Sequence, residues 1–165
     1  MDQLTEIRRP IEAEMKAYQR LFEETLTTDN PLLQLAMNHL MQRWGKMMRP
    51  MLVVLAARYA GQGRGTEAIG DVRVPEEVLH AAVALELLHT ASLVHDDVVD
   101  HSDRRRGQKS INALLDNQAA VLVGDFLLSK ALYHSARTGS NRVVTWVAEL
   151  GQQLADGELL QLVNL

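Results

Sequence analysis

Hydrophobic residues recur at helical spacing along almost the whole chain, and alternating runs of β-branched and aromatic residues are nearly absent. This pattern predicts an all-α fold. The expected helices are separated by short segments rich in Gly, Pro, Asn or Asp, and they cover residues 4–26, 31–43, 51–60, 75–100, 117–137 and 141–165. The one long loop is expected at the glycine-rich residues 61–75.

The helix expected at residues 75–100 is hydrophobic around most of its circumference, which is typical of a helix buried in a bundle. When successive residues are placed at about 100° intervals, His89, Asp96 and Asp100 fall within about 20° of one line. Asp97 lies about 80° away from that line. The acidic stripe is therefore expected to face an internal cleft or a gap at the end of the bundle.

Carboxylates on adjacent turns repel one another, and desolvating each costs several kcal/mol unless a cation compensates. Oxygen ligands without thiolates favour Mg²⁺, which binds through one or two carboxylates together with substrate phosphates. Three arginines follow the acids at residues 104–106, and another basic pair, Lys46 and Arg49, falls in an expected helix break. Acids and arginines together predict a magnesium site for a strongly anionic, phosphate-bearing substrate.

Each of these features alone has an ordinary structural explanation. An acidic helix end is usually solvated, clustered arginines usually pair with nearby acids, and a lone histidine such as His89 is usually a buried residue with its hydrogen bonds satisfied. Acids late in a helix are, however, disfavoured by the helix dipole. Their joint occurrence with the arginines is what favours a functional site.

Composition narrows the class of protein. The 165 residues suit one domain or a piece of a larger one, and the net charge of −4 gives no reason to expect a nucleic-acid partner. The absence of cysteine and of an apolar segment at the charged N-terminus favours a soluble, cytoplasmic protein without a membrane anchor. "DGELLQLVNL" stops within a helical pattern, so a fragment is expected.

Four motifs, in this order and spacing, resemble those of the trans-isoprenyl diphosphate synthases, also called polyprenyl synthetases. They are "WGKMMRP" (44–50), "LLHTASLVHDDVVDHSDRRRG" (87–107), "AVLVGDFLLSKAL" (120–132) and "DGELLQL" (156–162). The resemblance implies a helical bundle of the isoprenoid synthase type, with residues 1–165 as the N-terminal part of a single domain and a homodimer as the assembly. Trp44 and Met47 depart from the family pattern, which has glycine and arginine there.

The resemblance also implies roles for individual residues. Asp96 and Asp100 are expected to ligate Mg²⁺ bound to an allylic diphosphate, with Asp97 supporting the same cluster. Arg105 is expected to hold the allylic diphosphate, and Arg104 lies outside the pattern. The diphosphate of isopentenyl diphosphate is expected to be held by Lys46, Arg49, His89 and Arg106.

The implied reaction is chain elongation, in which Mg²⁺ assists ionisation of the allylic diphosphate and isopentenyl diphosphate attacks the resulting cation. The family's product-length positions correspond to Ala91 and Ser92, whose small side chains imply a longer product. The helical projection places Ser92 nearer the acidic stripe. The family's second aspartate-rich motif is missing before Leu165, so the chain alone is expected to be catalytically incomplete.

Two other interpretations remain open at this point. His95 and Asp96 form an "HD" pair like that of metal-dependent phosphohydrolases, with His80 or His89 and a later aspartate as further ligands, although this leaves Lys46, Arg49 and the RRG element unexplained. Alternatively, the chain is a non-catalytic subunit of a prenyl synthase.

Overall fold

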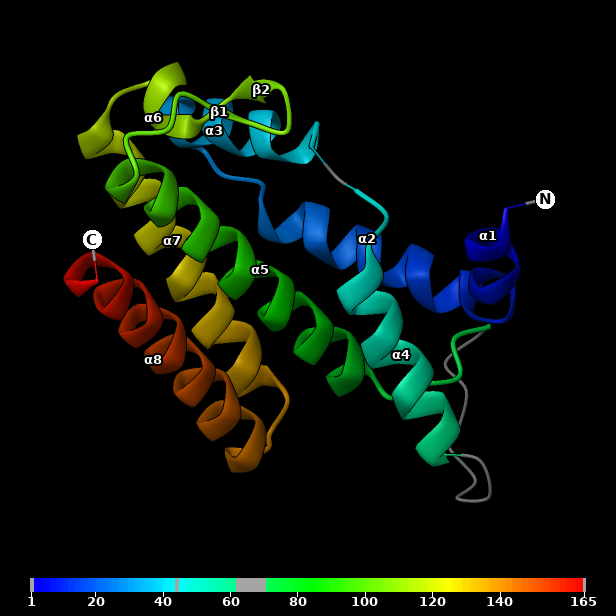
Figure 1. The fold of residues 1–165 in the computed structure, drawn as a ribbon. Coiled ribbons are helices and arrows are strands. Elements are labelled where there is room, and N and C mark those ends of the chain that lie inside the picture. Colours follow the sequence, from blue (N-terminus) through cyan, green and yellow to red (C-terminus); the bar gives the residue numbers. More distant parts are fainter. Residues whose placement is uncertain (1, 44, 62–70, 165) are drawn as a thin grey trace. The chain divides into compact units, whose positions relative to one another are not determined.

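The computed structural model describes residues 2–43, 45–61 and 71–164 and is almost entirely helical (Figure 1). In chain order, its elements are α1 (Gln3–Arg8), the 3₁₀ turn η1 (Arg9–Ile11), α2 (Glu12–Thr25), α3 (Pro31–Met41), α4 (Met48–Gly61), α5 (Glu76–Val99), β1 (Arg104–Arg105), β2 (Gln108–Lys109), α6 (Ile111–Leu114), α7 (Asn117–Arg137) and α8 (Asn141–Val163). The predicted all-α class is confirmed. Trp44 and most of the predicted glycine-rich loop, residues 62–70, lie outside the described residues.

Local sequence signals account for where most helices begin. The Asn30 side chain accepts hydrogen bonds from the backbone N–H groups of Leu32 and Leu33, and Pro31 occupies the first position of α3. Asp116 caps α7 in the same way by accepting from the N–H of Ala119 at 2.7 Å. The first expected helix is interrupted at η1, because Pro10 has no backbone N–H to donate.

The chain divides into two compact units, Met1–Glu86 and Leu87–Leu165, and the boundary falls inside α5. In the first unit, α2 packs against α4 and contributes Met15, Tyr18 and Phe22 to a buried apolar core. Glu14 is also buried there, and its carboxylate accepts a 2.9 Å hydrogen bond from the backbone N–H of Arg73. This bond fixes the segment that leads into α5.

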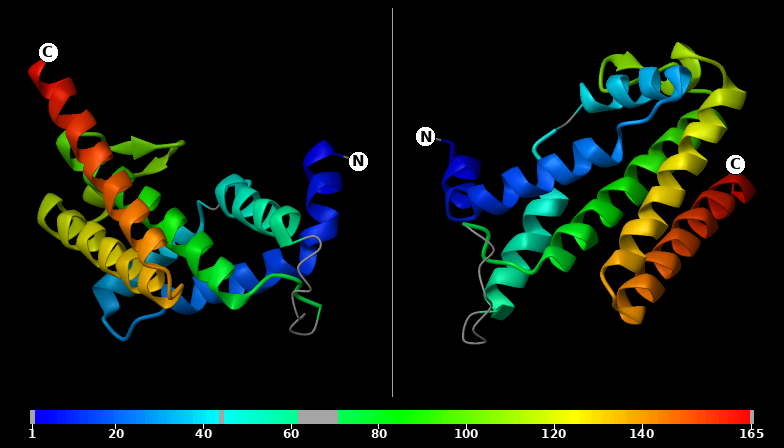
Figure 2. Two further views of the ribbon diagram at one scale, coloured as in Figure 1. Left: turned by 90° about the horizontal axis from the view of Figure 1, so that it is seen from below. Right: turned by 180° about the vertical axis from the view of Figure 1, so that it is seen from behind.

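The second unit consists of the later part of α5, the β1–β2 hairpin, α6, α7 and α8. The later part of α5 lies beside α7, and α7 packs against α8 (Figures 1 and 2). α8 also lies near α5, since a Cβ at Gly151 of α8 would lie at an ordinary contact distance of 3.7 Å from the Leu88 side chain. The buried core of this unit includes Leu87, Ala91, Val94, Ile111, Ala120, Val123, Leu127 and Ala131.

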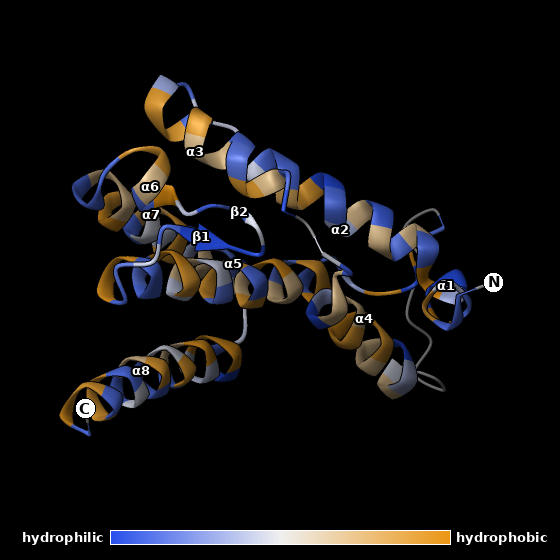
Figure 3. Cartoon of the chain, turned by 45° about the horizontal axis from the view of Figure 1, so that its top comes forward, coloured by the Kyte–Doolittle hydropathy of each residue, from blue (hydrophilic) through white to orange (hydrophobic). Residues whose placement is uncertain are grey.

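The helical pattern of the sequence did not predict the β1–β2 hairpin. Arg105 pairs with Gln108 across a two-residue turn, and both turn residues have positive φ, 50° at Arg106 and 79° at Gly107. Such a left-handed pair is the type I′ geometry that matches the twist of a hairpin. The hairpin is strongly hydrophilic, in contrast to the hydrophobic α5 (Figure 3).

Among the described residues, α5 alone is long and apolar enough to cross a membrane, judged by length and composition. Half of its most apolar window is buried inside the structure. The core helix of a folded protein meets the same criterion, so burial accounts for its composition.

Candidate functional site

Two of the predicted metal ligands, Asp96 and Asp100, lie at the C-terminal end of α5. The helix ends at Val99, and the backbone N–H of Asp100 donates to the Asp96 carbonyl at 2.8 Å. Asp96 is partly buried and Asp100 is exposed. The pKa of Asp96 is raised mainly by burial, and the negative charges of Glu158 and Asp100 add to the increase.

These acids fit a magnesium ion by donor chemistry. They are oxygen ligands whose mutual repulsion a cation would relieve. Within residues 2–43, 45–61 and 71–164, no three His, Asp or Glu side chains form a metal-binding group by themselves. A site with few protein ligands suits Mg²⁺, which usually completes its coordination with water and substrate phosphates.

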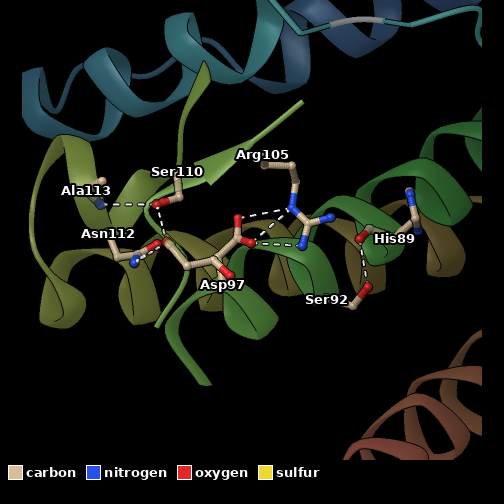
Figure 4. A network of polar contacts seen from close by, with 8 residues as sticks. His89, Ser92, Asp97, Arg105, Ser110, Asn112 and Ala113 are labelled. Carbon is tan, nitrogen blue, oxygen red and sulfur yellow. Dashed lines mark hydrogen bonds and ion pairs between the residues drawn. The ribbon is translucent and has the colours of Figure 1, made fainter. Parts of the chain in front are cut away.

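Asp97 makes a different set of contacts from its two neighbours. It is buried and forms a forked ion pair with Arg105, whose Nη2 lies 2.8 Å from Oδ1 and whose Nε lies 3.1 Å from both carboxylate oxygens (Figure 4). This hydrogen bond to Asp97 is also the main cause of the raised pKa of Arg105. Asp97 therefore holds the Arg105 guanidinium at the end of α5, while its predicted role toward the metal stays a prediction.

A network of hydrogen bonds holds the loop that carries the arginines. The Ser102 carbonyl accepts from the hydroxyl of the buried Ser110 at 2.7 Å and from the amide of Asn112 at 2.9 Å (Figure 4). The backbone N–H of Ser102 in turn donates to the Asp97 carbonyl at 2.9 Å. These bonds tie the hairpin to the last turn of α5. Arg106 lies at the turn of the hairpin, where it is exposed and has a positive φ.

The two predicted product-length residues have different surroundings. Ala91 is buried, whereas Ser92 is only partly buried and its hydroxyl donates to the carbonyl of His89 at 2.8 Å (Figure 4). His89, Ser92 and Asp96 follow one another along α5 at spacings of three and four residues, so they share one face of the helix. The structure thus places Ser92 one turn before the acidic end.

Lys46 and Arg49 belong to the first unit, whereas Asp96, Asp97 and Asp100 belong to the second. Lys46 is exposed, and Arg49 Nη1 lies 3.6 Å from the Glu86 carboxylate of α5. Met47, which departs from the family pattern, has a positive φ of 52°. That conformation disfavours a residue with a side chain, so the turn before α4 is locally strained.

Sequence reasoning missed Glu158 of α8 as a neighbour of the acidic cluster. Leu88 of α5 approaches Gly151 of α8, and Asp96 and Glu158 follow these two residues by eight and seven positions. Residues separated by about two turns return to the same helix face. Glu158 belongs to the "DGELLQL" motif, which the sequence already singled out. Only the packing of α8 beside α5 shows that this glutamate lies near Asp96.

The fold and this site define a helical protein with an acid–arginine cluster at the end of a buried helix. The family model described as polyprenyl synthetase matches residues 30–165. The octaprenyl diphosphate synthase of Escherichia coli is 39% identical over 142 residues, which are 86% of this chain and 41% of that protein.

Solved structures give the same result. A decaprenyl diphosphate synthase from Rhodobacter capsulatus superposes with a TM-score of 0.83 at 34% identity, covering 97% of this chain and 46% of that one. A Caulobacter crescentus polyprenyl synthase, complexed with calcium and isoprenyl diphosphate, has a TM-score of 0.84 at 34% identity, covering 97% and 45%.

The chain belongs to the polyprenyl synthetase family and has the all-α isoprenoid synthase fold. It spans less than half the length of these relatives. Both the predicted family and the predicted fold are thereby confirmed.

Proposed function

We propose that this chain forms part of a prenyltransferase that condenses isopentenyl diphosphate with an allylic diphosphate to give a longer polyprenyl diphosphate. The observation that carries the proposal is the Asp97–Arg105 ion pair, which holds a guanidinium beside the Asp96 and Asp100 carboxylates at the end of α5. Fixed guanidinium groups and carboxylates in one cluster suit a metal diphosphate.

Mg²⁺ bound by Asp96 and Asp100 would stabilise the charge that develops on the departing diphosphate. Arg105 contributes a fixed positive charge beside the same group without needing to reorganise, because Asp97 already orients it. A relative complexed with calcium and isoprenyl diphosphate supports the use of a divalent cation. We further propose that Lys46, Arg49, His89 and Arg106 bind isopentenyl diphosphate.

The phosphohydrolase interpretation is not favoured. Family membership supports a synthase, and the "HD" histidine is engaged elsewhere: His95 Nε2 lies 3.1 Å from the backbone carbonyl of Val121 in α7. The chain spans less than half the length of these relatives, and we propose that a further segment or subunit supplies the corresponding remainder of the enzyme. We propose a cytoplasmic homodimer as the assembly of the complete protein, by analogy with the family.

The test measures product formation from labelled isopentenyl diphosphate and an allylic diphosphate, with each substrate also supplied alone. The chain is assayed by itself and after fusion to a polypeptide that supplies the remaining half of a polyprenyl synthetase. We expect product only when both substrates and Mg²⁺ are present, and only in the completed protein. Release of diphosphate from one substrate alone would instead support hydrolysis, and activity of the isolated chain would refute its incompleteness.

Arg105→Lys is the sharpest variant for this assay, because lysine keeps the charge but cannot form the forked pair with Asp97. We expect a loss of about 10²-fold or more in kcat, on the scale of one lost preorganised donor. The matched control is Arg104→Lys on the same hairpin, since Arg104 is exposed and, in the described part of the chain, donates to the Gly107 carbonyl alone. Equal activity of the two variants would argue against a role for Arg105.

A further inference from the structure

His95 immediately precedes the first aspartate of the cluster, yet the proposed reaction assigns it no role. Its side chain is directed toward α7, where Nε2 lies 3.1 Å from the Val121 carbonyl and 3.4 Å from a carboxylate oxygen of Asp125. A carbonyl oxygen can only accept a hydrogen bond, so Nε2 carries a hydrogen and donates it. The imidazole thus links the last turn of α5 to the backbone of α7.

Gly124 of α7 provides the space for this ring. A Cβ at Gly124 would lie 2.2 Å from His95 Nε2 and 2.3 Å from its Cδ2, which is closer than real atoms approach. Glycine is intrinsically unfavourable inside a helix such as α7. The packing of the imidazole against the α7 backbone gives a physical reason for a glycine at this position.

The position of His95 connects this contact to the acids. Asp96 is the next residue along α5 and Asp100 is five residues after His95, so a rotation of the last turn of α5 would swing both carboxylates. The contact with α7 opposes that rotation. The ring interacts with the Val121 carbonyl and the Asp125 carboxylate, and it occupies the space left by the missing side chain of Gly124. Groups that orient ligand-bearing residues commonly matter to metal affinity almost as much as the ligands do.

We propose that His95 is a positioning residue, which seats against Gly124 and thereby fixes the direction of the Asp96 and Asp100 carboxylates for binding Mg²⁺ and diphosphate. The inference rests on the proposed function, since it assumes that these carboxylates bind a metal diphosphate. His95 itself touches neither substrate nor metal in this arrangement.

The experiment titrates the chain with Mg²⁺ and inorganic diphosphate by calorimetry, and melting temperatures are measured for the same samples. His95→Leu removes the donor, His95→Gln keeps an amide donor at similar reach, and Gly124→Ala fills the space below the ring. We expect diphosphate affinity to fall about tenfold or more in His95→Leu and Gly124→Ala, the range found for groups that orient metal ligands. Most of the affinity should return in His95→Gln.

Two control variants separate positioning from general destabilisation. Gly151→Ala is a second helical glycine-to-alanine change, and its Cβ would meet Leu88 at an ordinary 3.7 Å. Val147→Ala removes buried methyl groups of α8, whereas the His95 contacts described above are with α7, and it should lower the melting temperature. Both are expected to keep the diphosphate affinity of the unmodified chain.

The outcomes distinguish the inference from the function on which it rests. If the unmodified chain binds magnesium diphosphate and His95→Leu binds it equally well, or loses no more affinity than Val147→Ala, the positioning role is wrong. If neither the unmodified chain nor the completed protein binds magnesium diphosphate, the proposed function of this cluster is overturned and the inference with it. His95→Leu decides the question even if Gly124→Ala does not fold.

Discussion

Replacing Arg105 with methionine tests the ion pair that organises the site. Methionine keeps much of the aliphatic volume but leaves the Asp97 carboxylate, whose side chain is only 4% exposed, without its charged partner. Removing one partner of a buried pair typically costs about 3–5 kcal/mol. Because the Arg105 side chain is itself 31% exposed, we take the lower end and expect a loss of about 3 kcal/mol in the free energy of unfolding.

The measurement is urea unfolding followed by circular dichroism, arranged as a double-mutant cycle with Asp97→Asn. The pair has three hydrogen-bonded contacts, so we expect a coupling energy of about 1.5–3 kcal/mol between the two residues. For a chain of this length, the loss in Arg105→Met corresponds to a melting temperature lower by about 6–12 °C.

Arg104→Met serves as the control, because Arg104 is exposed and its side chain makes one hydrogen bond to the described residues, to the Gly107 carbonyl. Its substitution is expected to change stability by less than about 0.5 kcal/mol. The reasoning fails if Arg105→Met is no less stable than Arg104→Met, or if Asp97→Asn and Arg105→Met are simply additive.

Other predictions follow from neighbouring features. Because burial and then Glu158 raise the pKa of Asp96, the carboxyl binds its proton more tightly in the folded state, and its contribution to stability falls as pH rises above its ordinary 3.8. Glu158→Gln should therefore raise the unfolding free energy at neutral pH. It should also shift the acidic side of the pH profile of Mg²⁺-dependent diphosphate binding to lower pH. A pH profile that does not shift would contradict the proximity of the two acids. Arg106→Asn should stabilise the hairpin by up to about 1 kcal/mol, since asparagine tolerates a φ of 50°. The same change should raise the KM for isopentenyl diphosphate in the completed enzyme. A KM equal to that of the unmodified enzyme would show that Arg106 does not bind this substrate. Ser92→Phe should fold normally and shorten the product, and an unchanged product distribution would refute the product-length role. Ala91→Phe should instead lower the free energy of unfolding by about 1–3 kcal/mol, because Ala91 is buried.

Helix positions were largely predictable because they depend on local signals. Hydrophobic spacing, Asn30 with Pro31, and Asp116 each act within a few residues, and α7 begins and ends at the predicted residues 117 and 137. The shared face of His89 and Asp96 was predictable for the same reason, since it follows from the pitch of one helix. The family, too, was recognisable from motifs whose order and spacing survive in the linear sequence.

The hairpin was not predictable from periodicity, because its type I′ turn places a non-glycine residue, Arg106, at positive φ. Hydrogen bonds outside the turn compensate for this backbone strain. Ser110 and Asn112 both donate to the Ser102 carbonyl and close the loop back onto the end of α5. The sequence pattern of charges alone did not reveal these contacts.

The sequence by itself determined the helices, the family and the run of acids and arginines at the end of α5, since all of these are encoded in neighbouring residues. Only the tertiary structure decided the surroundings of each acid. Asp97 is buried against Arg105, whereas the pKa of Asp96 is raised by burial and by the charge of Glu158, although the two aspartates are adjacent in the chain. Adjacent residues of a helix lie about 100° apart around its axis, so Asp96 and Asp97 face different surroundings. Those surroundings, and the burial and charges that they impose, exist only after α8 and the hairpin have packed.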